Sequence, residues 1–369
     1  MDLDLNEEQE LLRDTVRGLC QRHAGLDVVR QLEDDPIGFP DKFWAALAES
    51  GILGLHLPEQ YGGSEMSILD AAVVYHELGR ALAPSPHFAS VVLSASAILA
   101  AGSDAQKDSW LPRLASGEAI VTPAWLEPDG GFGEKGVRLE ASGSGSSWTL
   151  TGRKRHVVFA KAADALLVLA RTGEGVGLFL VPTDASGVTL EQTFTLASDT
   201  QYDVTFDGAP AELVGTAGGG WATWDAVMRD GIILLASYAA GGAGYAHEIT
   251  TQYAKDRKQF DKPLGAFQSI AHYLADGIAA VDGAEVLAYE AAWARTEGRP
   301  EARRLAPMAK LFACKTFRDV TAVGQQVFGG VGFTLEYDIQ LYFRRAKVLQ
   351  LSWWNDRYLE ELIADEVLD

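Results

Sequence analysis

The side chains best suited to hold an anionic ligand lie in two segments of the C-terminal third of the chain. Arg257 stands in DRKQFDKPLGAFQ (residues 256–268), and a guanidinium offers a fork of N–H donors that matches a phosphate dianion. Gly329 and Gly330 stand in QQVFGGVGF (residues 325–333), where the missing side chains would let backbone N–H groups approach a ligand closely. Taken singly, Arg257 reads equally well as a surface arginine and the glycines as the end of a helix. On the residues alone, both readings stay open.

Two adjacent tryptophans, Trp353 and Trp354, follow the basic stretch FRRAK in the segment KVLQLSWWNDRY (residues 347–358). An indole has a donor N–H and no basic oxygen, so neither residue can remove a proton from a substrate. Both are expected to fill a cleft, to line an interface or to pack in the core. The carboxylates Glu336 and Asp338 of FTLEYD are expected to be ordinary surface charges.

Composition and charge exclude several classes of protein. The chain of 369 residues carries a net charge of −20, so no basic stripe exists to neutralise nucleic-acid phosphates. Its longest apolar runs, GIILLASYAAGGAGYA and HFASVVLSASAILAAG, are shorter than the roughly 20 residues that span a bilayer, and they are rich in Ala and Gly, as closely packed buried helices are. Cys20 and Cys314 are far apart, which predicts no metal site. The acidic N-terminus lacks a signal-peptide pattern, and a reducing cytoplasm is the expected location.

Hydrophobic periodicity divides the chain into three segments that must position these residues. Residues 1–120 read as helices, the first beginning after Asn6 as N-cap. Residues 121–215 contain short Val/Leu/Thr-rich runs separated by Gly, Ser and Asp, which is typical of an antiparallel β domain. Residues 216–369 return to a helical period. The order predicts an α+β fold without βαβ alternation.

That order and four local motifs resemble the acyl-CoA dehydrogenase family over essentially the whole chain. The motifs are LPEQYGG, LEP (residues 126–128), DRKQFDKPLGAFQ and QQVFGGVGF. The resemblance implies an N-terminal helical domain, a middle β domain of barrel type and a C-terminal domain like a four-helix bundle. It also implies FAD, a CoA thioester substrate, electron transfer to an electron-transferring flavoprotein, and an assembly built from dimers in which FAD is shared across the subunit interface.

The resemblance implies that the half of the site for the ADP part of FAD is present. Arg257 stands where the family's arginine meets the pyrophosphate, and Gln326 fits its hydrogen-bonding glutamine. The remaining residues at matching positions are Phe260, Gln268, Gly329 and Gly330.

The half of the site for the flavin ring departs from the family pattern. The family motif Tyr-x-x-Thr-Glu-Pro-x-x-Gly-Ser-Asp reads PAWLEPDGGFG here, which places Pro123, Leu126, Phe132 and Gly133 where the Tyr, Thr, Ser and Asp would stand. The family's Trp-x-Thr/Ser is replaced by His156 and Val158; a lone histidine on a strand is more often packed or solvated than a ligand. Because the apolar side chains cannot replace the hydroxyls, each unpaired polar group of the flavin edge would cost about 1–3 kcal/mol.

The family's catalytic base is also missing. Aligning RRAK with the family's RDAK places its usual glutamate at Trp353 and the following glycine at Trp354. The second position that the family uses for a base falls near Gly231; the adjacent Asp230 is a weak candidate, because its side chain would point about 100° away on a helix.

These departures lead to three hypotheses. The favoured one is the non-catalytic subunit of an α2β2 acyl-CoA dehydrogenase that acts on steroid side-chain CoA thioesters, paired with a second, catalytic chain. The second is a self-sufficient homotetrameric dehydrogenase with Asp230 as base. The third is a flavin-free scaffold or acyl-CoA-binding protein.

Overall fold

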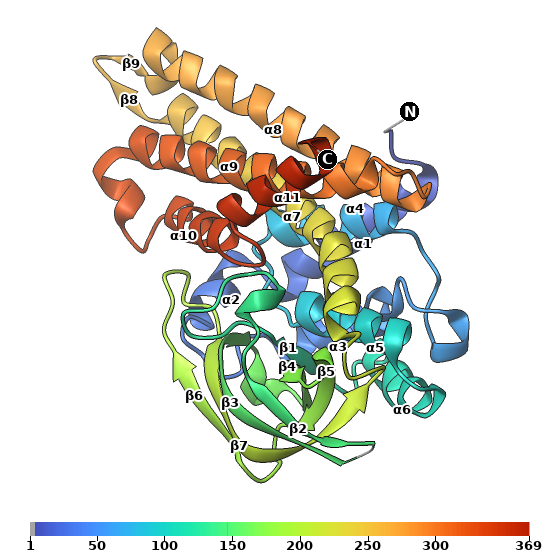
Figure 1. Ribbon diagram of the computed structural model, residues 1–369. Coiled ribbons are helices and arrows are strands. Elements are labelled where there is room, and N and C mark those ends of the chain that lie inside the picture. The colour runs from blue at the N-terminus through green and yellow to red at the C-terminus, as the bar shows by residue number, and fades with distance from the viewer. Residues whose placement is uncertain (1–3, 146, 369) are drawn as a thin grey trace. The chain divides into compact units, whose positions relative to one another are not determined.

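A computed structural model describes residues 4–145 and 147–368 and has the predicted order of helices, sheet and helices (Figure 1). The N-terminal helices are α1 (Glu7–His23), α2 (Leu26–Gln31), α3 (Asp41–Glu49), α4 (Ile68–Arg80), the π-helix η3 (Phe88–Ala95), α5 (Ser96–Ala101) and α6 (Asp104–Ala115). The C-terminal helices are α7 (Gly220–Asp256), α8 (Gln268–Thr296), α9 (Ala302–Phe328), α10 (Ile339–Leu351) and α11 (Asp356–Leu368). The predicted fold class is confirmed.

The strands of the middle domain close on themselves. They are β1 (Val121–Ala124), β2 (Glu140–Ser144), β3 (Ser147–Val158), β4 (Ala165–Thr172), β5 (Gly175–Pro182), β6 (Val188–Thr193) and β7 (Gln201–Val214). The pairings β4–β2–β3–β7–β5–β4 form a circuit around a core that includes Leu150, Val168, Phe179 and Phe206. Most pairs are antiparallel as predicted; β2 meets β4 in parallel at Glu140 and Arg171, and β1 and β4 are parallel, with Val121 opposite Ala165. The hairpin β2–β3 lies between these two strands in the chain and supplies the long connection that a parallel pair needs.

Packing groups the chain into two compact units that are each discontinuous in sequence. Unit 1 contains residues up to Val29, Ser67–Ala83 and residues from Ile232 on; unit 2 contains Arg30–Met66 and Pro84–Gly231. The boundary therefore falls inside α7. The division into segments 1–120, 121–215 and 216–369 remains a proposal about the sequence.

Local signals explain how the helices of unit 1 begin and how closely they pack. Asn6 caps α1 as predicted: its side chain accepts from the Gln9 amide at 2.9 Å, and the Gln9 side chain accepts from the Asn6 amide at 3.2 Å. The Ala/Gly-rich run in α7 is tightly packed, because a Cβ added at Gly241 would lie 2.0 Å from the carbonyl oxygen of His76. No helix among the described residues is long and apolar enough to cross a membrane.

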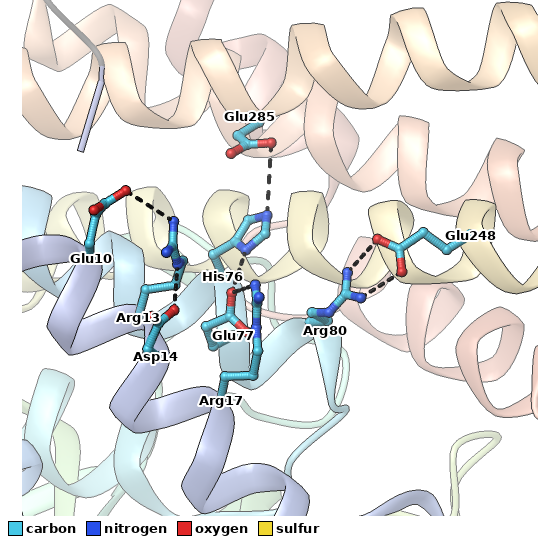
Figure 2. A network of polar contacts seen from close by, with 9 residues as sticks. All are labelled: Glu10, Arg13, Asp14, Arg17, His76, Glu77, Arg80, Glu248 and Glu285. Carbon is cyan, nitrogen blue, oxygen red and sulfur yellow. Dashed lines mark hydrogen bonds and ion pairs between the residues drawn. The ribbon is translucent and has the colours of Figure 1, made fainter.

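A buried ion-pair network joins α1, α4 and α8 within unit 1 (Figure 2). Glu77, which is only 1% exposed, accepts two hydrogen bonds of 2.8 Å from the Arg17 guanidinium. His76 lies 3.4 Å from Glu77 and 3.9 Å from Glu285 of α8. Burial opposes ionisation of Glu77, but the hydrogen bonds from His76 and Arg17 outweigh it and lower its pKa to about 2.

Candidate functional site

Arg257 stands directly after the last residue of α7 and its side chain is free to meet a ligand. Its amide donates to the Tyr253 carbonyl at 2.9 Å, and its carbonyl accepts from the Leu264 amide at 2.8 Å, so the backbone is fixed at both ends of a short hairpin. That hairpin pairs β8 (Lys258–Gln259) with β9 (Lys262–Pro263). The guanidinium is exposed and has no carboxylate partner among the described residues.

Phe260 and Gln268 lie on either side of this hairpin's second strand. Phe260 is at the tip with a positive φ of 52° and is 87% exposed, and its ring touches Phe267 edge-on at 6.2 Å between centroids. Gln268 is the exposed first residue of α8. A phenylalanine this exposed contributes little to folding, which suits a residue that meets another molecule.

The end of α9 offers an open backbone surface. Gln326 is exposed in the last turn of α9, and Gly329 and Gly330 begin the short helix η7 (Gly329–Phe333). Gly329 has φ 66° and ψ −141°, a conformation that only glycine adopts readily. A Cβ added at Gly329 or Gly330 would meet no atom within 4 Å. These residues therefore fit the requirement for close approach of a phosphate to the backbone.

Aromatic packing brings the two segments together. The Tyr253 ring, one turn before Arg257, stacks on Phe328 with centroids 4.1 Å apart and an interplanar angle of 15°. Tyr337 closes the group edge-on to both rings, at 6.2 and 5.6 Å. Because Phe328 directly precedes Gly329, this stack fixes the hairpin beside the glycine turn. The cofactor-binding role of the six predicted residues stays a prediction.

The residues predicted for the flavin-ring half lie in unit 2, and several of them are packed among apolar side chains. Pro123 is buried in β1, and Phe132, at the family's serine position, packs on Trp125 with centroids 5.8 Å apart. Trp125 packs in turn on the fully buried Trp224, at 5.3 Å. Leu126 and Val158 are half-buried. The segment is thus closed by an aromatic cluster in place of hydroxyl groups.

His156 is an exposed residue of an irregular strand segment. It has a positive φ of 56° and lies where the pairing of β3 with β7 shifts register, between Lys154 and Val157. Its Nδ1 is 2.9 Å from Oε1 of Gln201. His156 is therefore solvated and held by a neighbour, as expected for a lone histidine on a strand.

A buried ion pair in this segment was not foreseen from the sequence. Lys154 is 0% exposed, and its ammonium donates to Glu127 Oε1 at 2.6 Å and to the Trp125 carbonyl at 3.3 Å. The same Glu127 oxygen accepts from the amides of Arg138 and Leu139, each at 2.9 Å. Burial lowers the pKa of Lys154 to about 8 against the opposing charge of Glu127. A signal was available, because Lys154 follows the inward-facing Leu150 by four residues in β3, which puts it on the same face.

The two positions that could hold a base contain none. Trp353 is half-buried and Trp354 fully buried in the turn between α10 and α11. At Gly231, the second position, an added Cβ would lie 3.0 Å from Leu93 and 3.2 Å from Phe88, so a larger side chain would require these neighbours to shift. Asp230 is half-buried beside it. Glu336 is an exposed charge as predicted, and Asp338 is half-buried before α10.

Unit 1 also contains a cavity of about 250 Å³ between α7, α8 and α9. Its lining includes His247, Thr250, Tyr273, Phe312 and Lys315. None of the six predicted cofactor residues lines it. No group of three or more His, Cys, Asp or Glu residues among those described could hold a metal ion.

Comparison with known proteins identifies the class of protein that this fold and these motifs define. The family descriptions "Acyl-CoA dehydrogenase, N-terminal domain", "middle domain" and "C-terminal domain" match residues 6–118, 123–209 and 218–368. The chain belongs to the acyl-CoA dehydrogenase family.

Three similar proteins illustrate this membership. Acyl-CoA dehydrogenase FadE27 of Mycobacterium tuberculosis is 31% identical over 88% of this chain and 87% of its own length. A variant of the steroid ACAD Tcur3481–Tcur3483 is 31% identical, with a TM-score of 0.88 over 98% of this chain and 99% of the other. The ChsE4–ChsE5 complex of Mycobacterium tuberculosis is 28% identical, with a TM-score of 0.90 over 100% of this chain and 99% of the other.

Proposed function

We propose that this chain is the non-catalytic subunit of a heteromeric, FAD-dependent acyl-CoA dehydrogenase. It contributes the ADP-side half of an FAD site whose flavin-ring half belongs to a second, catalytic acyl-CoA dehydrogenase chain in an α2β2 assembly. The observation that carries the proposal is the contrast between the open Arg257–Gly329 region and the packed segment at Phe132, together with the absence of a carboxylate at Gly231 and Trp353.

The ADP-side residues support a binding role because their exposure has no structural explanation. An unpaired guanidinium, an exposed phenylalanine and two open glycines converge through the Tyr253–Phe328 stack. The pyrophosphate of FAD would be held by Arg257 and by backbone N–H groups at Gly329 and Gly330, while Gln326, Phe260 and Gln268 would contact the rest of the ADP part.

Exposed apolar side chains on α8 and α9 support association with another chain. The large ones are Tyr273, Ile278 and Val286 on α8 and Met308 and Phe312 on α9, and all of them are exposed. Two neighbouring long helices (Figure 1) that present this many apolar side chains to water mark a protein–protein interaction site. The names ChsE4–ChsE5 and Tcur3481–Tcur3483 of two structural neighbours each denote two components.

The proposed joint reaction is α,β-dehydrogenation of an acyl-CoA, and we propose a steroid side-chain CoA thioester as substrate because the neighbour of 31% identity is a steroid ACAD. FAD would supply the acceptor for the hydride that leaves the β-carbon, and the catalytic chain would supply the carboxylate that removes the α-proton. The electrons would leave to an electron-transferring flavoprotein. This chain's own residues would hold the cofactor's ADP part and stabilise the assembly.

The deciding measurement is flavin content per chain, for this protein alone and co-expressed with a neighbouring acyl-CoA dehydrogenase that has the family's Thr/Ser and Glu positions. We expect no flavin on the lone chain and one FAD per pair of unlike chains in the complex. In the complex, Arg257→Ala should weaken FAD binding about tenfold or more, because a charged hydrogen bond is lost. Arg304→Ala, which removes an exposed arginine of α9, should not.

The alternatives make different predictions. A self-sufficient homotetramer that uses Asp230 would bind one FAD per chain unaided, and it would lose activity on replacement of Asp230. A flavin-free scaffold or acyl-CoA-binding protein would carry no flavin even in the complex. Either result would exclude the split-site function.

A further inference from the structure

A fully buried lysine lies under the double-tryptophan turn. Lys310, in the middle of α9, is 0% exposed. Its ammonium donates to the carbonyl oxygens of Leu349 at 3.3 Å, Ser352 at 3.1 Å and Trp354 at 2.9 Å. An ammonium has three N–H donors, so all of them are used on one short segment.

The three carbonyls belong to the end of α10 and the turn that follows it. Leu349 lies in the last turn of α10 and Ser352 is its C-cap, where carbonyl groups have no partner within the helix. A positive charge at a helix C-terminus also interacts favourably with the helix dipole. Lys310 therefore supplies hydrogen-bond donors to carbonyl groups that receive none from the helix or from solvent.

The turn itself has an unfavourable backbone. Trp353 and Trp354 are consecutive residues with φ of 52° and 70°, in the left-handed region that costs about 1–2 kcal/mol for each residue other than glycine. Such conformations persist only where surrounding contacts determine them. The fully buried Trp354 ring packs edge-on against Tyr358 of α11, 5.3 Å away.

The titratable groups around Lys310 come from two elements. Burial lowers its pKa, while Cys314 on the next turn of α9 and Asp356 at the start of α11 oppose the shift. Asp356 is held by the Gln350 side-chain amide at 2.5 Å. The hydrogen bonds that the structure gives to the ammonium all go to carbonyl groups of the turn.

We propose that Lys310 is a positioning residue that locks the turn of residues 352–355 in its left-handed conformation, so that Trp353 and Trp354 are held in fixed positions. The inference rests on the proposed function in one respect: that function takes Trp353 to stand at the position of the family's base. It goes further because hydrogen bonds from Lys310 hold the backbone at that position in place, in addition to the missing carboxylate.

The test is hydrogen exchange of the peptide that spans residues 349–356 in the full chain. The Ser352 amide donates to the Val348 carbonyl at 2.9 Å and reports on the turn. Lys310→Met should raise its exchange rate at least about tenfold, because three buried carbonyls lose their donor. Lys315→Met, which removes an exposed lysine from the same helix, should leave the rate unchanged. Equal exchange in Lys310→Met and the unmodified chain would overturn the proposal.

A glycine at the strained position separates a clamp from a general packing role. Trp353→Gly removes the cost of the left-handed backbone at residue 353. In that background, Lys310→Met should therefore raise the exchange rate by a factor at least about threefold smaller than it does in the unmodified chain. Purely additive effects of Lys310→Met and Trp353→Gly would contradict the clamp. Failure of Lys310→Met to fold in both backgrounds would contradict it as well. Flavin content of the same samples decides the proposed function separately: flavin on the lone chain would refute the split site and leave the exchange result standing.

Discussion

The segments around Arg257 and around Trp125, where the resemblance predicts the ADP half and the flavin-ring half of a cofactor site, differ in how they are packed. Around Arg257 the predicted side chains are exposed, a Cβ added at Gly329 or Gly330 would meet no atom within 4 Å, and the stacked rings of Tyr253 and Phe328 fix the backbone. Around Trp125, three aromatic rings and a buried ion pair fill the segment. Exposed groups without a structural role point to a ligand from outside, whereas a filled segment stabilises the fold. The proposed function requires this difference: an open region that can meet a ligand and a filled region that stabilises the fold.

The largest effect that would sharpen this comparison is expected from Lys154→Met. Removing the lysine leaves the carboxylate of Glu127 buried without its ion-pair partner, which should lower the free energy of unfolding by about 3 kcal/mol. Urea unfolding measures the loss. Lys135→Met, at an exposed lysine of the same unit, should have no effect, and Lys154→Met/Glu127→Gln should lose less than Lys154→Met. An effect of Lys154→Met as small as that of Lys135→Met would show that the pair does not stabilise this region.

A smaller effect is expected from Phe132→Ser, which restores the family's residue at this position. Loss of the ring contact with Trp125 should lower the free energy of unfolding by about 1–2 kcal/mol and should not give the lone chain a flavin spectrum. Phe194→Ser, at a largely exposed phenylalanine of the same unit, provides the control in thermal unfolding. If the lone Phe132→Ser chain became yellow, the ring side would be one substitution from function and the comparison would fail.

The smallest effect on stability is expected in the open region. Gly330→Ala adds a methyl group where no atom lies within 4 Å, so the melting temperature should stay the same. In the complex with a catalytic chain it should lower flavin occupancy, because the methyl group would block close approach of a phosphate. Gly25→Ala is matched, since its added Cβ also meets nothing within 4 Å, and it should change neither quantity. Full flavin occupancy in Gly330→Ala would remove the glycine turn from the site.

Much of the fold could be predicted because periodicity and capping are local properties. The order of helices and strands and the N-cap Asn6 follow directly from residue spacing. The parallel pairing of β1 with β4 could not be predicted, since it depends on which distant strand completes the barrel. The motif positions at Arg257 and Gly329 could be located from the sequence, but their openness could not.

The two buried lysines were missed for a common physical reason. Lysine is normally exposed, so Lys154 and Lys310 read as surface residues although both stand on the inward face of their elements. Lys310 lies three and seven residues before Ala313 and Phe317, both buried, which is the apolar face of α9. What makes burial possible in each case is a set of acceptors from a distant part of the chain. Such sets appear only once the chain is folded.

Because unit 1 is discontinuous in sequence, it can be completed only late in the synthesis of the chain. Helices α1 and α4 leave the ribosome early, yet residues of unit 1 continue from Ile232 to the C-terminal end of the chain. Glu77 can pair with Arg17 at once, but Glu285, which lies against His76, is synthesised some two hundred residues later. Since chains emerge at about 5–20 residues per second, the N-terminal helices must wait on the order of ten seconds or more for their packing partners. During that time their apolar faces are uncovered. A nascent chain truncated before α8 is therefore expected to need a chaperone, whereas the finished chain is expected to need none.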